Sequence, residues 1–250
     1  MASEYLRKLG RVLPWALLGG FFALLIFLPL KWVGPKILPV NMTSAETQYS
    51  GSIWKGRVSQ LTDLDSVDFT LKPLNVLRGE RPATFVAKAT GLNVSGSAGK
   101  RQAQDISFAI NMASLPLPDP RLKGLAGMAT ARIENVEWND LGACESITGR
   151  AQSDILQSNQ GLFNWSGPVI SGPIRCDDTG AYVFTLTGKD QTQSIETLIT
   201  ISASGSYKAD INVTTRDQNA ALALPLFGFE EKSRNSAGRQ FVLIEQGQWR

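Results

Sequence analysis

The two cysteines, Cys144 and Cys176, are the side chains in this sequence whose chemistry is most narrowly defined. A catalytic thiol ordinarily has a histidine partner, and a redox pair is ordinarily spaced Cys-x-x-Cys; the chain has no histidine, and its cysteines lie far apart. Two thiols also fall short of a four-ligand zinc site unless carboxylates or a second chain contribute. A structural disulfide is therefore favoured over two free thiols, and it requires an oxidising compartment.

Other catalytic chemistry is poorly supported. Without histidine the chain cannot form a Ser-His-Asp or Cys-His arrangement or a histidine-based metal site, and it carries neither a phosphate-binding nor a dinucleotide-binding glycine motif. The carboxylate pairs Asp177-Asp178 and Glu230-Glu231 are adjacent in sequence, so their side chains are expected to point apart as solvated charges. A Ser/Lys dyad stays open as an alternative. We expect no catalytic, cofactor or metal site, and a membrane-anchored enzyme is the least favoured hypothesis.

A long apolar run near the N-terminus predicts a membrane anchor. Val12 to Leu30 contains no charged residue, and at about 1.5 Å per residue it crosses a hydrocarbon core of roughly 30 Å. Trp15 and Trp32 lie at its ends, where indoles favour the water–lipid interface. The hydrophobic region of a signal peptide is shorter, about 7–15 residues. We therefore expect an uncleaved transmembrane helix over residues 12–33 rather than a signal peptide.

Charge and spacing around this helix predict its orientation. Three basic residues lie in the N-terminal segment, residues 1–11, and two follow the helix, which favours a cytoplasmic N-terminus. Ala16 and Gly20, like Gly19 and Ala23, have the spacing of helix-pairing faces. Ordinary small residues explain that spacing better, with a weak homodimer as the alternative.

The rest of the chain is predicted to be an antiparallel β-rich domain with few short helices, residues 48–250, after an extended linker over residues 34–47. Strict apolar/polar alternation, as in Val67, Phe69 and Leu71, marks strands that bury one face. The net charge of +3, with no basic stripe, argues against nucleic-acid binding.

Two segments interrupt the strand pattern. Asp217 to Phe227 predicts a helix, with Asn219 as its cap and Gly228 as its stop. The proline-rich stretch 115–127 predicts a long loop and a candidate waist between subdomains.

Three short elements carry a family resemblance. Gly51, Trp54 and Gly56 lie in Gly-Ser-Ile-Trp-Lys-Gly-Arg-Val; Cys144 is followed by Gly-Arg-Ala at 149–151; and Trp165 precedes Gly-Pro-Ile-Arg-Cys at 172–176. With the anchor and connector, these elements make the chain resemble protein N of the bacterial type II secretion system over most of its length. The individual motifs are short and moderately specific.

The resemblance implies an accessory component of the bacterial inner membrane, single-pass, with its main domain in the periplasm and no catalytic residues. It implies other type II secretion inner-membrane subunits as partners, with the secretin assembly as a further candidate.

The Gly-x-x-Trp-x-Gly element is also similar to sequences in AsmA-type envelope proteins, which are thought to handle lipids. The alternative function is therefore the handling or shielding of lipids on a groove of the β-sheet. An open groove lined by Val67, Phe69, Leu71 and Ile106 would favour the lipid-handling hypothesis, whereas a closed, packed core would count against it.

Overall fold

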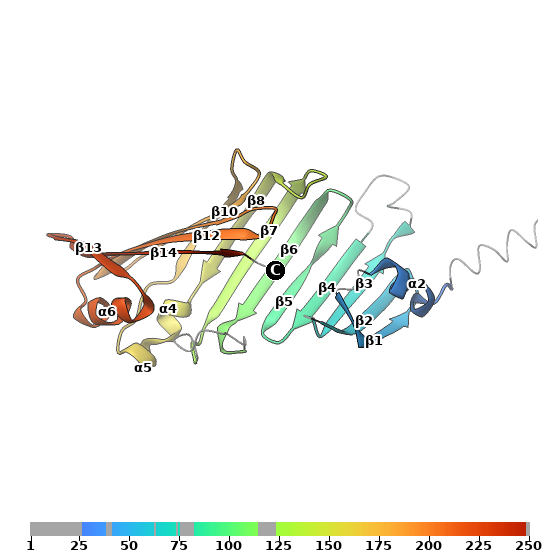
Figure 1. Ribbon diagram of the computed structural model, residues 1–250, viewed down its shortest axis with the longest axis horizontal. Coiled ribbons are helices and arrows are strands. Elements are labelled where there is room, and N and C mark those ends of the chain that lie inside the picture. Colours follow the sequence, from blue (N-terminus) through green and yellow to red (C-terminus); the bar gives the residue numbers. More distant parts are fainter. Residues whose placement is uncertain are drawn as a thin grey trace, which may run out of the picture.

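One antiparallel sheet forms the body of the molecule. The computed structural model describes residues 27–38, 42–62, 64–73, 75, 83–114 and 124–248. Within them, 14 strands hydrogen-bond in sequence order, except that β14 lies between β12 and β13. Figure 1 shows this broad, twisted sheet, with α2 at one end and α4, α5 and α6 at the other. The prediction of a mainly β, antiparallel fold with few helices is confirmed.

The strands are β1 (Thr43–Gly51), β2 (Lys55–Leu61), β3 (Ser66–Leu71), β4 (Ala83–Ala89), β5 (Leu92–Ala98), β6 (Gln102–Asn111), β7 (Met128–Trp138), β8 (Cys144–Ser153), β9 (Ile170–Cys176), β10 (Tyr182–Lys189), β11 (Gln193–Ile201), β12 (Ser206–Thr215), β13 (Glu230–Asn235) and β14 (Gly238–Gln248). The helices are α2 (Leu30–Ile37), α4 (Ile155–Ser158), α5 (Gln160–Phe163) and α6 (Gln218–Ala223), with 3₁₀ turns η2 (Met112–Ser114) and η4 (Leu224–Phe227).

The register gathers apolar residues on one face of the sheet. Directly paired residues project to the same side of an antiparallel sheet. Phe69 on β3 pairs with Phe85 on β4, and the same face continues through neighbouring strands to Val213 on β12 and its partner Phe241 on β14. We call this side the apolar face. The intervening residues, mostly polar or charged, form the opposite polar face.

A bulge in β6 keeps the apolar face continuous. Ser95 pairs with Ser107 but Ser97 pairs with Gln104, so β6 holds one extra residue, and Asp105 there has φ 51°. An extra residue shifts the alternation by one position. Ala103 therefore joins Ile106 on the apolar face.

The buried core lies toward the C-terminal end of the sheet. There α6 and η4 pack on the apolar face, and eight residues form the largest buried cluster: Trp165, Ile195, Val213, Ala220, Ala221, Ala223, Leu224 and Phe241. A second cluster of Ala151, Ile174 and Leu186 continues it toward the middle.

The predicted helix near the C-terminus is confirmed, but its predicted cap was wrong. The Asp217 carboxylate, not Asn219, accepts hydrogen bonds from the backbone N–H groups of Asn219 and Ala220, at 2.7 and 3.1 Å. Aspartate before the first helical residue is a strong cap. Gly228 ends the segment with φ 88°, as expected.

The predicted membrane span falls mainly on residues outside the described part of the chain. Residues 12–26 are not described, and among the described residues no helix is both long and apolar enough to cross a membrane. The extended linker over 34–47 was wrong in part, because residues 34–37 belong to α2 and β1 begins at Thr43.

The segment proposed as a waist joins two directly paired strands. Residues 115–123 lie outside the described ranges, but β6 and β7 on either side pair from Gln102 with Glu137 to Asn111 with Met128. The sheet therefore runs through this point without interruption.

Candidate functional site

Among the described residues, little covers the middle of the apolar face. In β3, β4 and β5 no residue is fully buried, and in β6 and β7 only Ala103 and Val136, which pair with each other, are. We call the apolar-face side chains of β3 to β7 the open face. It includes Val67, Phe69, Leu71, Phe85, Ala87, Val94, Ile106, Phe108 and Ala131, all half-buried. A continuous apolar surface that its own fold leaves only half-buried is a candidate binding surface.

The polar face behind this region carries a shallow hollow. Its volume is about 460 Å³, and it lies over β1 to β4. Arg57 and Asp68 pair there through two hydrogen bonds of 2.6 and 2.9 Å. The hydrogen bond from Arg57 lowers the pKa of Asp68, and the same pair raises the pKa of Arg57. The pair is exposed and already satisfied, so this hollow offers no evident acid or base.

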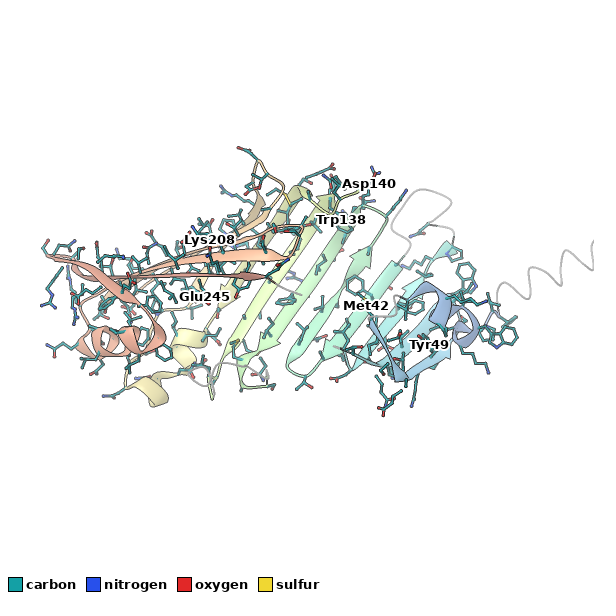
Figure 2. The ribbon with its side chains drawn as sticks, in the orientation of Figure 1. Met42, Tyr49, Trp138, Asp140, Lys208 and Glu245 are labelled. Atoms are coloured by element: carbon teal, nitrogen blue, oxygen red, sulfur yellow. A yellow bond between two sulfur atoms is a disulfide. The ribbon has the colours of Figure 1, made fainter. Side chains whose placement is uncertain are left out.

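Helix α2 covers the N-terminal end of the apolar face. A Cβ at Gly56 would lie 2.7 Å from Leu30 Cδ2 of α2 and 2.9 Å from Phe69 Cζ, and a Cβ at Gly34 would lie 2.4 Å from the Tyr49 ring. Tyr49 lies beside α2 (Figure 2). A side chain at either position would therefore force α2 or its neighbouring side chains to shift.

The predicted family motif forms the turn that receives this helix. Gly51 closes β1 with φ 84°, and the Trp54 carbonyl accepts a 2.6 Å hydrogen bond from the backbone N–H of Leu71. The Ile53 N–H bonds to the Leu28 carbonyl just before α2, at 3.1 Å. Trp54 is half-buried. In the described structure, Gly51, Trp54 and Gly56 thus act in packing the N-terminal segment against the sheet.

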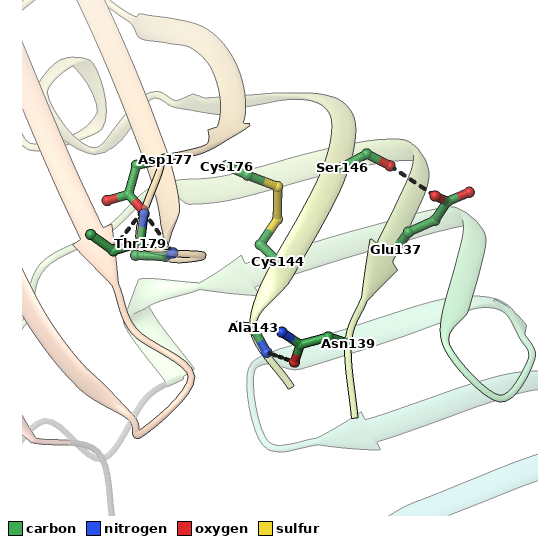
Figure 3. The surroundings of a disulfide bond; sticks show 9 residues. Glu137, Asn139, Ala143, Cys144, Ser146, Cys176, Asp177 and Thr179 are labelled. Carbon is green, nitrogen blue, oxygen red and sulfur yellow. Dashed lines mark hydrogen bonds between the residues drawn. A yellow bond between two sulfur atoms is a disulfide. The ribbon is translucent and has the colours of Figure 1, made fainter. Parts of the chain in front are cut away.

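The predicted disulfide is confirmed. Cys144 opens β8 and Cys176 closes β9, two paired antiparallel strands, and the sulfurs are bonded across a Cα separation of 5.6 Å (Figure 3). Cys144 also donates its backbone N–H to the Gly180 carbonyl at 2.8 Å. The bond lies far along the sheet from the Gly51–Gly56 turn, so the two predicted elements do not form one site.

Two side-chain-capped turns flank the disulfide. Asp177 accepts hydrogen bonds from the Thr179 hydroxyl at 2.7 Å and from the Ala181 N–H at 2.9 Å. The bond from Thr179 is the main reason that the pKa of Asp177 is lowered. On the other side, Asn139 accepts from the Ala143 N–H at 3.1 Å (Figure 3). Asp177 is therefore a turn-forming carboxylate.

A polar network fixes Trp165, from the third family-like element, in the covered core. Its indole N–H donates to the Gln193 side chain at 2.9 Å, and Gln193 donates to Asp190 at 2.9 Å and to the Ser166 carbonyl at 2.6 Å. Burial raises the pKa of Asp190, but hydrogen bonds from Thr192 and Gln193 outweigh burial, so the pKa is lowered. The buried hydrogen bond between Trp165 and Gln193 holds a single arrangement of this part of the core.

Ser-x-x-Lys spacing, which would support the Ser/Lys dyad left open above, occurs at Ser52–Lys55 and at Ser97–Lys100. Ser52 Oγ lies 3.3 Å from the backbone N–H groups of Trp54 and Lys55, and the Ser97 hydroxyl donates to the Gln104 carbonyl at 3.2 Å. Both hydroxyls therefore serve in backbone contacts. Among the described residues, no three His, Cys, Asp or Glu side chains gather as a metal site.

Comparison with known proteins gives one family match. The family model for type II secretion system (T2SS), protein N, matches residues 45–236. No curated protein matches the chain, and neither does any solved structure. The matched range includes the Gly51–Gly56 turn, the open face, the disulfide and α6.

Proposed function

The chain belongs to the type II secretion system protein N family, with an accessory role in type II secretion, and we propose that it acts as a non-catalytic component of the inner membrane. The family match over residues 45–236 carries this proposal. The engaged serines, the satisfied Arg57–Asp68 pair and the turn-forming Asp177 support the non-catalytic role.

The proposed topology places the N-terminus in the cytoplasm and the sheet in the periplasm. The apolar run at 12–30 and the disulfide between Cys144 and Cys176 support it, since disulfides persist in oxidising compartments. Alkaline phosphatase, which is active only outside the cytoplasm, tests it when fused after Arg250. We expect activity in that fusion. An inactive fusion together with reduced cysteines would contradict the topology.

The proposed partners are the other inner-membrane subunits of the secretion machine, with the secretin assembly as a further candidate. Copurification of the tagged full chain from membranes of secreting cells tests this, with an unrelated tagged single-pass protein as the control. We expect secretion subunits to be enriched over that control. Absence of every subunit at native expression would argue against the proposed partners. Pairing of two copies through residues 16–23 stays a prediction.

A second candidate function, the shielding of lipids, is favoured by the open face. Val67, Phe69, Leu71 and Ile106 share that face, and all four are half-buried beneath no second layer of strands among the described residues. An apolar face that no second layer of described strands covers favours lipid handling over a closed, packed core. Mass spectrometry of lipid extracted from the purified full chain tests it. We expect stoichiometric phospholipid, and a lipid-free protein would weigh against this function.

A further inference from the structure

We propose that the open face seats the acyl chains of an anionic phospholipid drawn from the bilayer, with the headgroup beside α2. This inference rests on the second candidate function, the shielding of lipids. It specifies the lipid that binds, the end of the open face at which the lipid enters, and where the lipid lies on the sheet.

The chemistry of the open face suits hydrocarbon and not peptide. Its side chains are Ala, Val, Leu, Ile and Phe, and the backbone beneath them is paired within the sheet, as in the unbroken ladder of β3 with β4. A peptide lying there would leave its own N–H and C=O groups without partners, which is costly away from water. An acyl chain has no such groups.

The length of the open face matches an acyl chain. Five strands spaced about 4.8 Å apart cover about 19 Å. One leaflet of a bilayer, half of a hydrocarbon core of about 30 Å, gives about 15 Å for an ordered chain. At one end Leu30 of α2 covers Gly56, and at the other the covered core begins with Ala151 and Ile174. A chain lying across the strands therefore fits between these two covers.

The surroundings of α2 identify the source of the lipid. Phe27 and Trp32 are 77% and 62% exposed, an unfavourable state in water but a suitable one at the membrane interface. Lys31 and Lys36 are exposed on the same helix and complement an anionic headgroup. The uncharged run ending at Leu30 leads directly into this helix. The α2 end of the open face is thus the end nearest the bilayer.

Photo-crosslinking in intact cells tests the occupant. Phe108 on the open face is replaced by photoreactive benzoyl-phenylalanine, and its neighbour Ser107, on the polar face of the same strand, serves as the matched control. We expect phospholipid adducts at position 108 at least fivefold above those at position 107. Disulfide formation, scored on a non-reducing gel, verifies that both proteins fold.

The alternative outcomes separate the hypotheses. Equal lipid yields at the two positions, or adducts at position 108 with a second copy or another protein, would overturn the acyl-chain seat. If the purified wild-type chain also lacks lipid, the second candidate function fails as well. The copurification with secretion subunits is independent of both outcomes.

The headgroup claim has its own test in vesicles. The full chain with benzoyl-phenylalanine at position 108 is reconstituted in vesicles of phosphatidylglycerol or of phosphatidylcholine. It is compared with the same chain carrying Lys31→Glu and Lys36→Glu together. Lys100→Glu with Lys189→Glu makes the same charge change away from α2. We expect the α2 pair, and not the control pair, to reduce phosphatidylglycerol adducts severalfold and to leave phosphatidylcholine adducts unchanged. Equal effects of the two pairs would overturn entry beside α2.

Discussion

Gly56 is the residue at which the family motif, the sheet and α2 meet. A side chain there would collide with Leu30 and Phe69, at 2.7 and 2.9 Å from its first carbon. The motif can therefore act through packing alone, because its glycine leaves room for the helix that follows the apolar run. This gives the motif a mechanical role, as the seat of α2.

Replacing Gly56 by valine tests this role. We expect Gly56→Val to destabilise the fold by about 1–3 kcal/mol, as overpacking ordinarily does, and to release α2. Thermal unfolding gives the stability, and trypsin cleavage after Lys31 and Lys36 reports release of the helix. Gly161→Val is the control, since a Cβ at Gly161 meets no atom within 4 Å. Equal protection of α2 in both variants would contradict its seating on Gly56.

The disulfide acts at the residue scale on the unfolded chain. Its cysteines are 32 residues apart, and in the chain-entropy model closing such a loop stabilises by about 3–4 kcal/mol. We expect Cys144→Ser with Cys176→Ser to lower the free energy of unfolding by about that amount, measured by denaturant titration. A loss below about 1 kcal/mol would show that the paired strands β8 and β9 hold this region without the bond.

At the scale of elements, the turn between β10 and β11 ties Trp165 to the core. The Asp190 carboxylate accepts a hydrogen bond from the Gln193 side chain, and Gln193 accepts one from the Trp165 indole N–H. Because the pKa of Asp190 is lowered in the folded protein, its charge stabilises the fold above the unfolded pKa, near 3.9 for aspartate. This stabilisation is lost as pH falls through the lower, folded value.

Asp190→Asn is therefore expected to change the pH profile of stability. At pH 7 the variant should be less stable by about 1 kcal/mol, through weaker turn hydrogen bonds. As pH falls below about 4, the variant should lose less further stability than the wild type, because it has no carboxylate at position 190 to protonate. Thermal unfolding between pH 2.5 and 7 measures both, with Asp178→Asn on another turn as the control. Parallel profiles for wild type and Asp190→Asn would refute this assignment.

At the scale of the whole molecule, the described residues cover the sheet at its two ends and leave it open between them. Val94 and Val213 both lie on the apolar face, but Val94 is half-buried on the open face and Val213 is 3% exposed beneath α6. The same substitution should therefore have different costs at the two positions.

Serine at each of these valines measures the difference. We expect Val213→Ser to cost about 2–4 kcal/mol, because it leaves a cavity and a buried hydroxyl, and Val94→Ser to cost less than about 1 kcal/mol. Urea unfolding of the lipid-free chain gives both values. Comparable losses at the two positions would mean that a packed layer covers the middle of the sheet.

The sequence predicts this architecture only in part, for physical reasons. Alternation identifies strands such as β3, where one face is apolar, but β1 (Thr43–Gly51) is mostly polar, and its first five residues fell in the predicted linker. Leu198 lies in a run of mostly apolar residues and yet is 41% exposed, because β11 alternates and places it on the polar face. A local window cannot reveal which strands pair.

The sites were predicted unevenly for the same reason. The disulfide followed from the chemistry of two cysteines without histidine. Gly51, Trp54 and Gly56 were found as a pattern, but the partners of Gly56, Leu30 and Phe69, are set by the packing of α2 on the sheet. How much of the apolar face stays uncovered depends on which strands α2 and α6 cover, and that coverage is a property of the whole fold.

Secretion from a deletion strain tests most directly the combined claim that the protein acts in type II secretion, as proposed, and needs its open face to do so. The strain is complemented with wild type, Phe108→Glu or Ser107→Glu, which place one charge on opposite faces of β6, and exoprotein in the medium is measured. We predict full rescue by wild type and Ser107→Glu and a loss of at least fivefold with Phe108→Glu, at equal levels of disulfide-bonded protein. Equal rescue by both variants, or undiminished secretion without the gene, would contradict the claim.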